Sequence, residues 1–193
     1  MKELFSQLRG AALATLTLAV VCCGLYPFVV FGLSQAIFPD QANGSLILDK
    51  GGSVRGSKLL GQGFTGEKYF HSRPSAAGNG YDAANSGGSN LGPTSQKLRD
   101  SIKERVETYR QENRLKPNQP VPADAATASG SGLDPDISLN NAELQGPRVA
   151  AARGLSERQV RQLIREHTAE PDLRILGEPR VNVLTLNLAL DNL

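Results

Sequence analysis

The stretch "AALATLTLAVVCCGLYPFVVFGL", Ala11 to Leu33, decides the architecture of this chain. No charged residue occurs from Gly10 to Pro39. An α-helix rises about 1.5 Å per residue, so a helix of this length crosses the roughly 30 Å hydrocarbon layer of a bilayer. We therefore predict a membrane-spanning helix at residues 10–33.

A cleaved signal peptide is the alternative. Its apolar core runs about 7 to 15 residues and ends at a small-residue cleavage site. Here the apolar run is longer, and Ser34-Gln35-Ala36 is only a weak match to such a site. We therefore expect a retained anchor, preceded by a tail at residues 1–9 and followed by one folded domain at residues 34–193.

The two flanks of the apolar run differ in charge. Lys2 and Arg9 precede it, whereas the first basic residue behind it is Lys50. The positive-inside rule assigns the more basic flank to the cytoplasm. We predict a single-pass protein of the inner (plasma) membrane, with a cytoplasmic N-terminus and a periplasmic, or extracytoplasmic, C-terminal domain.

Small residues recur along the predicted span. Membrane helices associate by close packing at such residues. We expect contacts with other helices at Gly10, Ala11, Ala14, Gly24 and Gly32. Cys22 and Cys23 are the only cysteines, and we interpret them as small packing residues; lipidation, which favours juxtamembrane cysteines, is the alternative.

Behind the anchor, local patterns predict a mixture of strands and helices. Ser45–Asp49 and Val54–Leu60 flank "KGGS" and predict a hairpin. Apolar residues spaced by three and four predict a helix at residues 94–113. Ser138 is the expected N-cap of a helix through Ala152, and Ser156 with Gln159 forms a capping box for another.

The last run, "RVNVLTLNLAL" (Arg180 to Leu190), alternates leucine with other residues and predicts a terminal strand. The predicted fold class is a mixed α/β (α+β) extracytoplasmic domain on a single N-terminal transmembrane helix.

With 21 Lys+Arg against 19 Asp+Glu, the chain lacks the basic excess of a nucleic-acid-binding protein.

The stretch "YFHSRPSAAGNGYDAANSGGSNLGP", Tyr69 to Pro93, is the part least easily explained as scaffold. Loops longer than about 12 to 15 residues are usually functional or disordered. A loop with so few apolar side chains must be held by backbone hydrogen bonds or by another protein. The two hypotheses are a docking surface and a loop folded back on its own domain.

Several motifs suggest chemistry that their surroundings do not support. "GQGFTG", Gly61 to Gly66, matches a dinucleotide fingerprint, but "EKYFHSRP" behind it is a poor helix. Ser72, His71 and Asp82 could form a catalytic triad on paper, without a nucleophile elbow. "SGGSN" and "SGSG" could hold an anion, but the lysine of a P-loop is absent. We expect no catalytic residue, no metal site and no cofactor held by this chain.

Four further stretches stand out: "YFHSRPSAAGNGYDAANSGGSNLGPTSQKL", "VPADAATASGSGLDPDIS", "QGPRVAAARGLS" and "GEPRVNVLTLNLALD". Together they resemble the KdpC family, the C subunit of the Kdp potassium-transporting ATPase. The resemblance covers essentially the whole chain, including the N-terminal helix and the order of the motifs. One departure is Asp136, where many members carry histidine, and "SLNNA" replaces a commoner Ser-Pro start. This puts in doubt any role that depends on a basic group at that position.

The resemblance implies a non-catalytic accessory subunit of a high-affinity, ATP-driven potassium uptake complex. Its implied partners are the pore-forming potassium-binding subunit, the P-type ATPase subunit and a small single-helix subunit, and ATP and potassium would be handled by the complex. The family is described as stabilising assembly and assisting ATP binding by the ATPase subunit, as a catalytic chaperone. Because the predicted topology places the domain across the membrane from ATP, we expect an indirect effect through the complex.

Partner contacts are expected along the matching motifs. The candidates are Arg73, Pro74, Ser75, Gly87, Gly88, Ser89, Asn90, Gly132, Asp134, Gln145 and Arg148. Glycine allows close approach of a partner backbone, and arginine offers a fork of donors. The alternatives from other classes are a signal-anchored periplasmic hydrolase using Ser72 or Ser89, and a free-standing binding module.

Overall fold

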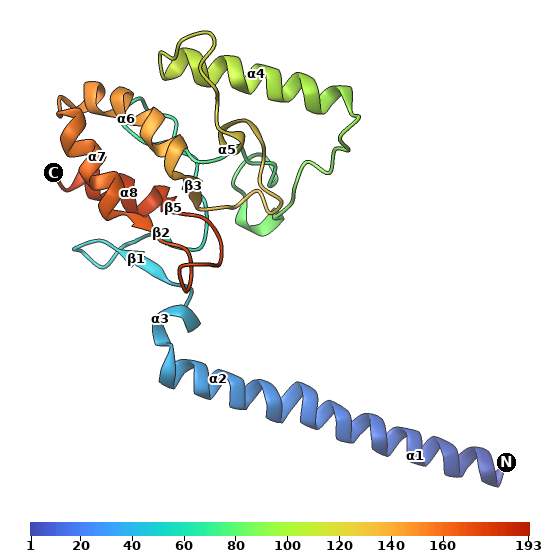
Figure 1. The fold of residues 1–193 in the computed structure, drawn as a ribbon. Coiled ribbons are helices and arrows are strands. Elements are labelled where there is room, and N and C mark those ends of the chain that lie inside the picture. Colours follow the sequence, from blue (N-terminus) through green and yellow to red (C-terminus); the bar gives the residue numbers. More distant parts are fainter. The chain divides into compact units, whose positions relative to one another are not determined.

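The computed structural model describes residues 1–193, apart from the side chain of Lys2. The chain divides into two compact units, Met1–Arg55 and Gly56–Leu193. Figure 1 shows a long helix in the first unit and a mixed α/β arrangement in the second. This agrees with the predicted fold class.

The first unit consists largely of a helix that is long and apolar enough to cross a membrane, Glu3–Ile37. It comprises α1 (Lys2–Ala19), a π-helical segment (Val20–Leu25) and α2 (Tyr26–Ile37). The helix extends beyond both ends of the predicted span at residues 10–33. Its 35 residues exceed the number a bilayer needs, so the ends can reach into the interfacial layers.

The π-helical segment lies immediately before Pro27. Proline has no N–H, and its ring clashes with the carbonyl four residues earlier in an α-helix. The wider turn accommodates this: the Tyr26 N–H donates to the Val21 carbonyl, five residues back. Pro27 is therefore absorbed within a continuous helix, as expected of a membrane helix.

A short helix and a hairpin follow the membrane helix. They are α3 (Pro39–Ala42), β1 (Leu46–Leu48) and β2 (Val54–Ser57), and the two strands form a two-stranded sheet. The Asp49 carboxylate accepts hydrogen bonds from the Gly51 and Ser53 N–H groups, both 2.9 Å, and thereby shapes the turn. The predicted hairpin is confirmed.

The second unit contains a small antiparallel sheet. Its strands are β3 (Asp136–Ser138), β5 (Arg180–Asn182) and β4 (Thr168–Ala169), in that spatial order. Ile137 lies opposite Val181, and both side chains are buried. Such short strands need cover from helices, since small sheets are not stable alone.

Helices of the second unit are α4 (Gln96–Glu112), α5 (Ala123–Ala126), α6 (Leu139–Arg153), α7 (Glu157–Glu166) and α8 (Val183–Asp191), with a 3-10 turn (η2) at Ala83–Asn85. Of these, α4, α6 and α7 lie close to the predicted positions, whereas α5 and α8 were not predicted as helices. Ser138 caps α6, and Gly154 ends it in the left-handed conformation. Ser156 and Gln159 form the predicted capping box of α7.

The core of the second unit lies between the sheet and helices α6, α7 and α8, which gather around it in Figure 1, while α4 runs along the opposite side of the unit. Its buried members include Phe70, Ile137, Val149, Val160, Ile164, Val181 and Leu186. Phe70 does not belong to any strand or helix, so the segment around it is built into the core.

The predicted terminal strand is wrong beyond Asn182. After β5 the chain forms α8, and the Asn182 side chain caps this helix by accepting from the Thr185 N–H at 3.1 Å. The buried residues of α8 are Val183, Leu184, Leu186, Asn187 and Leu190, which follow the helical spacing. The alternating leucines misled because leucine occupies both the buried face and the flank of the helix.

Two leucines separate the helix from the predicted strand. Leu186 is fully buried and Leu188 is only partly buried, whereas a strand would place both on one face. We expect Leu186→Ala to lower the free energy of unfolding by about 3 kcal/mol, and Leu188→Ala by less than about 1 kcal/mol. Urea denaturation of the full chain in detergent measures both. Equal losses would contradict the helical register.

Candidate functional site

The backbone of Glu67–His71 runs from the surface into the core at Phe70 without a neighbouring strand. Buried backbone N–H and C=O groups must nevertheless find partners. Here side chains supply them: every carbonyl from Glu67 to His71 accepts a hydrogen bond from Arg148, Arg153, Asn187 or Gln145. We call Glu67–His71 the clamped segment.

Two carboxamides act toward this segment as a strand neighbour would. The Phe70 N–H donates to Asn187 Oδ1 at 2.8 Å, and Asn187 Nδ2 donates back to the Phe70 carbonyl at 2.9 Å. Gln145 forms the same pair with His71, at 2.7 and 3.1 Å. Gln145 and Asn187 are each 1% exposed, so these bonds are shielded from water.

Arg148 holds the beginning of the clamped segment. Its Nη1 donates to the carbonyls of Glu67 at 2.6 Å and Tyr69 at 3.0 Å, its Nη2 to Gln145 Oε1, and its Nε to Asn113 Oδ1. Burial lowers the pKa of the Arg148 guanidinium from its usual value. The four hydrogen bonds replace its lost hydration, so a charge is accommodated at 7% exposure.

The network continues from Gln145 to α4 and α5. Gln145 Nε2 and the Tyr109 hydroxyl both donate to Asn141 Oδ1, at 2.9 and 2.8 Å. Asn141 Nδ2 donates to Asp124 Oδ2, which also accepts from the Ser138 N–H. Burial and the nearby Asp124 carboxylate raise the pKa of Tyr109, so its hydroxyl stays protonated and donates. The network therefore ties α4, α5 and α6 together.

The long loop, Tyr69–Pro93, lies against a second loop, Ala128–Pro135. Ser75 Oγ donates to the Gly132 carbonyl at 2.6 Å, and the Gly87 N–H donates to the Ser131 carbonyl at 2.8 Å. Gly132 has φ +67°, and a Cβ there would lie 2.6 Å from the Ala77 nitrogen and 2.7 Å from the Gly87 carbonyl oxygen. The two loops are thus in backbone contact at Gly132, where no side chain fits.

Charged and aromatic side chains add to this contact. Arg73 Nη1 donates to Asp134 Oδ2 at 2.6 Å, while Tyr81 closes the loop internally by donating to the Arg73 carbonyl at 2.6 Å. Asp134 also accepts from the Asp136 N–H. Pro74 lines a neighbouring cavity. These contacts show the loop folded onto its own domain both at Arg73–Ser75 and at Gly87, as one of the two hypotheses proposed.

The later part of the long loop has a free side. Gly87 and Gly88 are partly buried, whereas Ser89 and Asn90 are exposed. A Cβ on Gly88 would lie 3.0 Å from the Gly130 carbonyl oxygen, so one side of this strip faces the second loop. The other side carries Ser89 and Asn90, which remain available to a partner.

Six of the candidate docking residues are partly buried in the loop contacts described above (Arg73, Pro74, Ser75, Gly87, Gly88 and Asp134), and the other five are either buried or exposed. Gln145 and Arg148 lie inside the domain and hold the clamped segment, and Gly132 is buried between the loops. Any part that these three have in docking acts by shaping the loop. Ser89 and Asn90 lie on the surface, where direct contact is possible.

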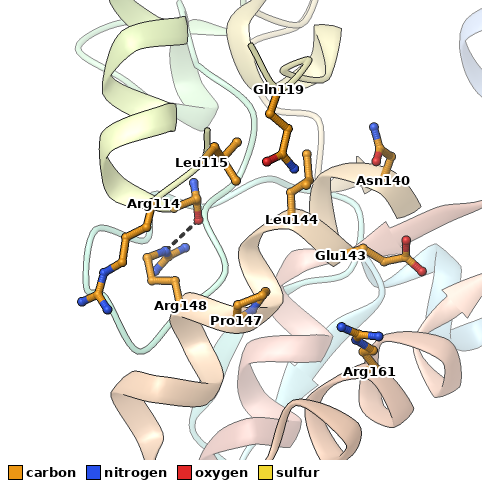
Figure 2. A pocket seen from close by; sticks show the side chains of 10 residues that line it. Arg114, Leu115, Gln119, Asn140, Glu143, Leu144, Pro147, Arg148 and Arg161 are labelled. Atoms are coloured by element: carbon orange, nitrogen blue, oxygen red, sulfur yellow. Dashed lines mark hydrogen bonds between the residues drawn. The ribbon is translucent and has the colours of Figure 1, made fainter. Parts of the chain in front are cut away.

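Two cavities lie beside the network. The larger, about 520 Å³, is formed by α6 residues, by Arg114 and Leu115 behind α4, and by Arg161 of α7 (Figure 2). Figure 2 also shows the Arg148–Asn113 hydrogen bond at its side. The second cavity, about 320 Å³, is lined by His71, Ser72 and the α4 side chains Glu104, Arg105 and Glu112, among others.

His71 lies at the second cavity, with Nδ1 3.5 Å from Glu112 Oε2. Burial and the Arg148 charge lower the pKa of His71, and outweigh the opposing effect of Glu112. The ring Nε2 lies 3.1 Å from the Gly66 carbonyl oxygen. Ser72 Oγ donates elsewhere, to the Gln62 carbonyl, and Asp82 caps the 3-10 turn. The structure therefore engages Ser72, His71 and Asp82 separately rather than as a triad.

The structure shows what surrounds the GQGFTG motif and Asp136, which the sequence had singled out. "GQGFTG" is followed by a turn, with no helix to receive a pyrophosphate, and the Gly61 N–H donates to the Leu133 carbonyl at 2.8 Å. Asp136 pairs across the sheet with Arg180 at 3.2 Å and accepts from Asn182, and burial raises its pKa. Among the described residues, no group of three His, Cys, Asp or Glu side chains could hold a metal ion.

Several residues that build the site were not singled out in the sequence, among them Asn113, Asp124, Asn141, Arg153 and Asn187. A signal for part of the set exists in α6. Asn141, Gln145 and Arg148 follow the spacing of four and three that marks one helical face. Polar side chains at core spacing indicate a buried network rather than a solvated face.

Removing the carboxamide of Gln145 should destabilise the domain. Gln145→Leu keeps much of the volume but leaves the His71 N–H and C=O buried without partners, so we expect a loss of about 3 kcal/mol in the free energy of unfolding. The matched control is Gln162→Leu on the exposed face of α7, expected within about 0.5 kcal/mol. Denaturation in detergent checks both, and a loss for Gln145→Leu as small as the control would show that the pairing is unimportant.

Comparison with known proteins identifies relatives over nearly the full length. Residues 8–192 match the family described as "KdpC: K+-transporting ATPase, c chain". A protein of Mycobacterium bovis named "Potassium-transporting ATPase KdpC subunit" is 56% identical over 187 residues, which cover 97% of this chain and 98% of the relative. Proteins of the same name from Koribacter versatilis and Caulobacter vibrioides are 52% and 53% identical, over 98% and 97% of this chain and 94% of each relative.

The match includes the membrane helix, the clamped segment, both loops and the α6–α8 core. The chain therefore belongs to the KdpC family, the c chain of K+-transporting ATPase.

Proposed function

We propose that this chain is a non-catalytic accessory subunit of the Kdp complex, which stabilises assembly and assists ATP binding by the P-type ATPase subunit from across the membrane. Its partners are the pore-forming potassium-binding subunit, the ATPase subunit and the small single-helix subunit. The observation that carries the proposal is the family match over residues 8–192, which includes the apolar helix as well as the domain.

The architecture supports a subunit rather than an enzyme acting alone. One helix cannot line a selective pore, so this chain would need partners for transport. The polar groups at the centre of the domain hold its own backbone, from the clamped segment to the second loop. Chemistry and transport are then the work of the partners.

The docking surface that we propose is the exposed side of the long loop, around Ser89 and Asn90, lying on the outer face of the pore-forming subunit near the potassium entrance. The second loop holds this strip from behind through the Gly87–Ser131 hydrogen bond, while Gln145 and Asp134 hold the beginning of the same loop at His71 and Arg73. A fixed surface loses little conformational entropy on binding. Uncharged Ser and Asn side chains also cost less to desolvate than full charges.

An effect on ATP binding does not require contact with ATP. Two conformations of the ATPase subunit that differ in their contacts with this chain would shift in population when it binds. The same coupling would make ATP strengthen the retention of this chain, because linkage between two binding events is reciprocal.

Docking is tested by placing a bulky charge on the exposed strip. We expect Ser89→Arg to reduce recovery of the other subunits with the tagged chain about tenfold, and to raise the apparent KM for ATP in what remains assembled. The thermal melting of the chain itself should stay unchanged, because Ser89 is exposed. Gln162→Arg on α7 is the control. Ser89 is preferred to Gly88 or Arg73, whose substitution would disturb contacts within the domain. Full recovery with Ser89→Arg would exclude this surface.

The proposed topology is tested separately. Lys2 and Arg9 lie before the apolar run and Lys50 after it, so we propose a cytoplasmic N-terminus. Alkaline phosphatase fused after Leu193 should be active, since this enzyme folds only after export, and a green fluorescent protein at the same position should not fluoresce when exported by the general secretion route. The opposite pattern would reverse the orientation and make direct contact with ATP possible.

A further inference from the structure

The π-helical segment leaves the Cys22 carbonyl of the membrane helix without its usual partner. In an α-helix the Cys22 carbonyl would accept from the Tyr26 N–H, but that N–H donates to Val21 instead. In a continued π-helix the donor would be residue 27, which is proline and has no N–H. Neither helical geometry therefore supplies a backbone donor to Cys22.

An acceptor without a donor is costly at this position. Cys22 lies near the middle of the apolar helix Glu3–Ile37, where the hydrocarbon layer offers no water. Each unsatisfied backbone group there costs several kilocalories per mole, so membrane helices obtain donors from neighbouring helices or side chains. Cys22 and Cys23 are both exposed on the helix.

We propose that the Cys22 carbonyl is a docking point for a neighbouring membrane helix, which donates a hydrogen bond from a hydroxyl or carboxamide side chain. The inference rests on the proposed function, because it requires this chain to be assembled with other membrane subunits. It gives the helix a role beyond tethering. The contact is made by a backbone oxygen, which is present whatever side chain stands at position 22.

The face that carries Cys22 allows a helix to approach. Thr15 and Ala19 lie seven and three residues before Cys22, hence on the same side of the helix. Small residues bring backbones close together in membranes, and a side-chain donor must come close to reach a main-chain carbonyl. Gly24, in the same π-helical segment, has open space where a Cβ would lie.

The composition of the chain allows this carbonyl to be observed directly. Cysteine occurs only at positions 22 and 23, so cysteine labelled with ¹³C at its carbonyl marks only these two peptide groups within this chain. Subtracting the infrared spectrum of a labelled Cys22→Ala complex from that of the labelled native complex isolates the Cys22 carbonyl, because the other subunits contribute equally. Cys23→Ala isolates the neighbouring carbonyl in the same way.

We expect the Cys22 band of the purified chain in detergent to lie at the high frequency of a carbonyl without a hydrogen bond. In the assembled complex it should shift to lower frequency, since accepting a hydrogen bond weakens the C=O bond. An identical band in the free chain and the complex, at either frequency, would overturn the proposal. A low-frequency band in the free chain would mean that water or the chain itself already satisfies the carbonyl.

Substitution gives a second, functional readout. Pro27→Ala restores the missing N–H and should satisfy the carbonyl within the helix, so retention of this chain by the other subunits should fall about three- to tenfold. Pro39→Ala, at the start of α3, is the matched control.

The outcomes distinguish this inference from the function on which it rests. If the native chain is not recovered with the other subunits at all, the proposed function fails. If the native complex assembles, but Pro27→Ala is retained equally and the Cys22 band does not shift, only the docking point is wrong.

Discussion

The folded domain depends on one requirement: the backbone at Phe70 passes through the core and has no strand beside it. Phe70 is completely buried, and so its N–H and C=O groups cannot turn to water. Carboxamides and guanidinium groups carried by α6 and α8 replace the absent strand. A side-chain amide has the same donor and acceptor as a peptide group, which explains why asparagine and glutamine occupy the two central positions.

Much of the remaining architecture follows from this clamp. Gln145 and Arg148 can reach the segment only if α6 is held at a fixed distance, and Asn141, Tyr109 and Asp124 fix α6 against α4 and α5. The long loop leaves the clamp at Ser72 and returns along the second loop, where Gly132 permits contact between backbones. A loop with few apolar side chains thereby becomes a fixed surface, because its order is supplied by hydrogen bonds rather than by burial.

The membrane helix faces the same need for hydrogen-bond partners of its backbone carbonyls, but in a bilayer instead of water. In the domain, a carbonyl without a strand neighbour is satisfied by side chains of the same chain. In the helix, Pro27 removes a donor, and the helix itself supplies no backbone N–H in its place. A soluble helix would leave the free carbonyl to water, whereas a bilayer supplies none. Both parts of the chain therefore need donors for backbone carbonyls that lack them. The domain supplies these donors from its own side chains, and in our proposal a neighbouring helix of the complex supplies the donor to the membrane helix.

The sequence by itself determined what depends on neighbours along the chain. An uncharged run is long enough to span a bilayer, Ser138 and Ser156 begin helices, Gly154 ends one, and the quoted motifs identified the family. Only the tertiary structure decided what depends on residues distant in sequence. Alternating leucines after Asn182 fit a strand or a helix, and burial against the core selected the helix. The partners of His71 and Phe70 lie 74 and 117 residues away, so no local pattern could assign them. Hydrogen bonds between residues so far apart in sequence form only when the chain has folded. The entropy lost in closing such long loops is offset only by packing of the complete core.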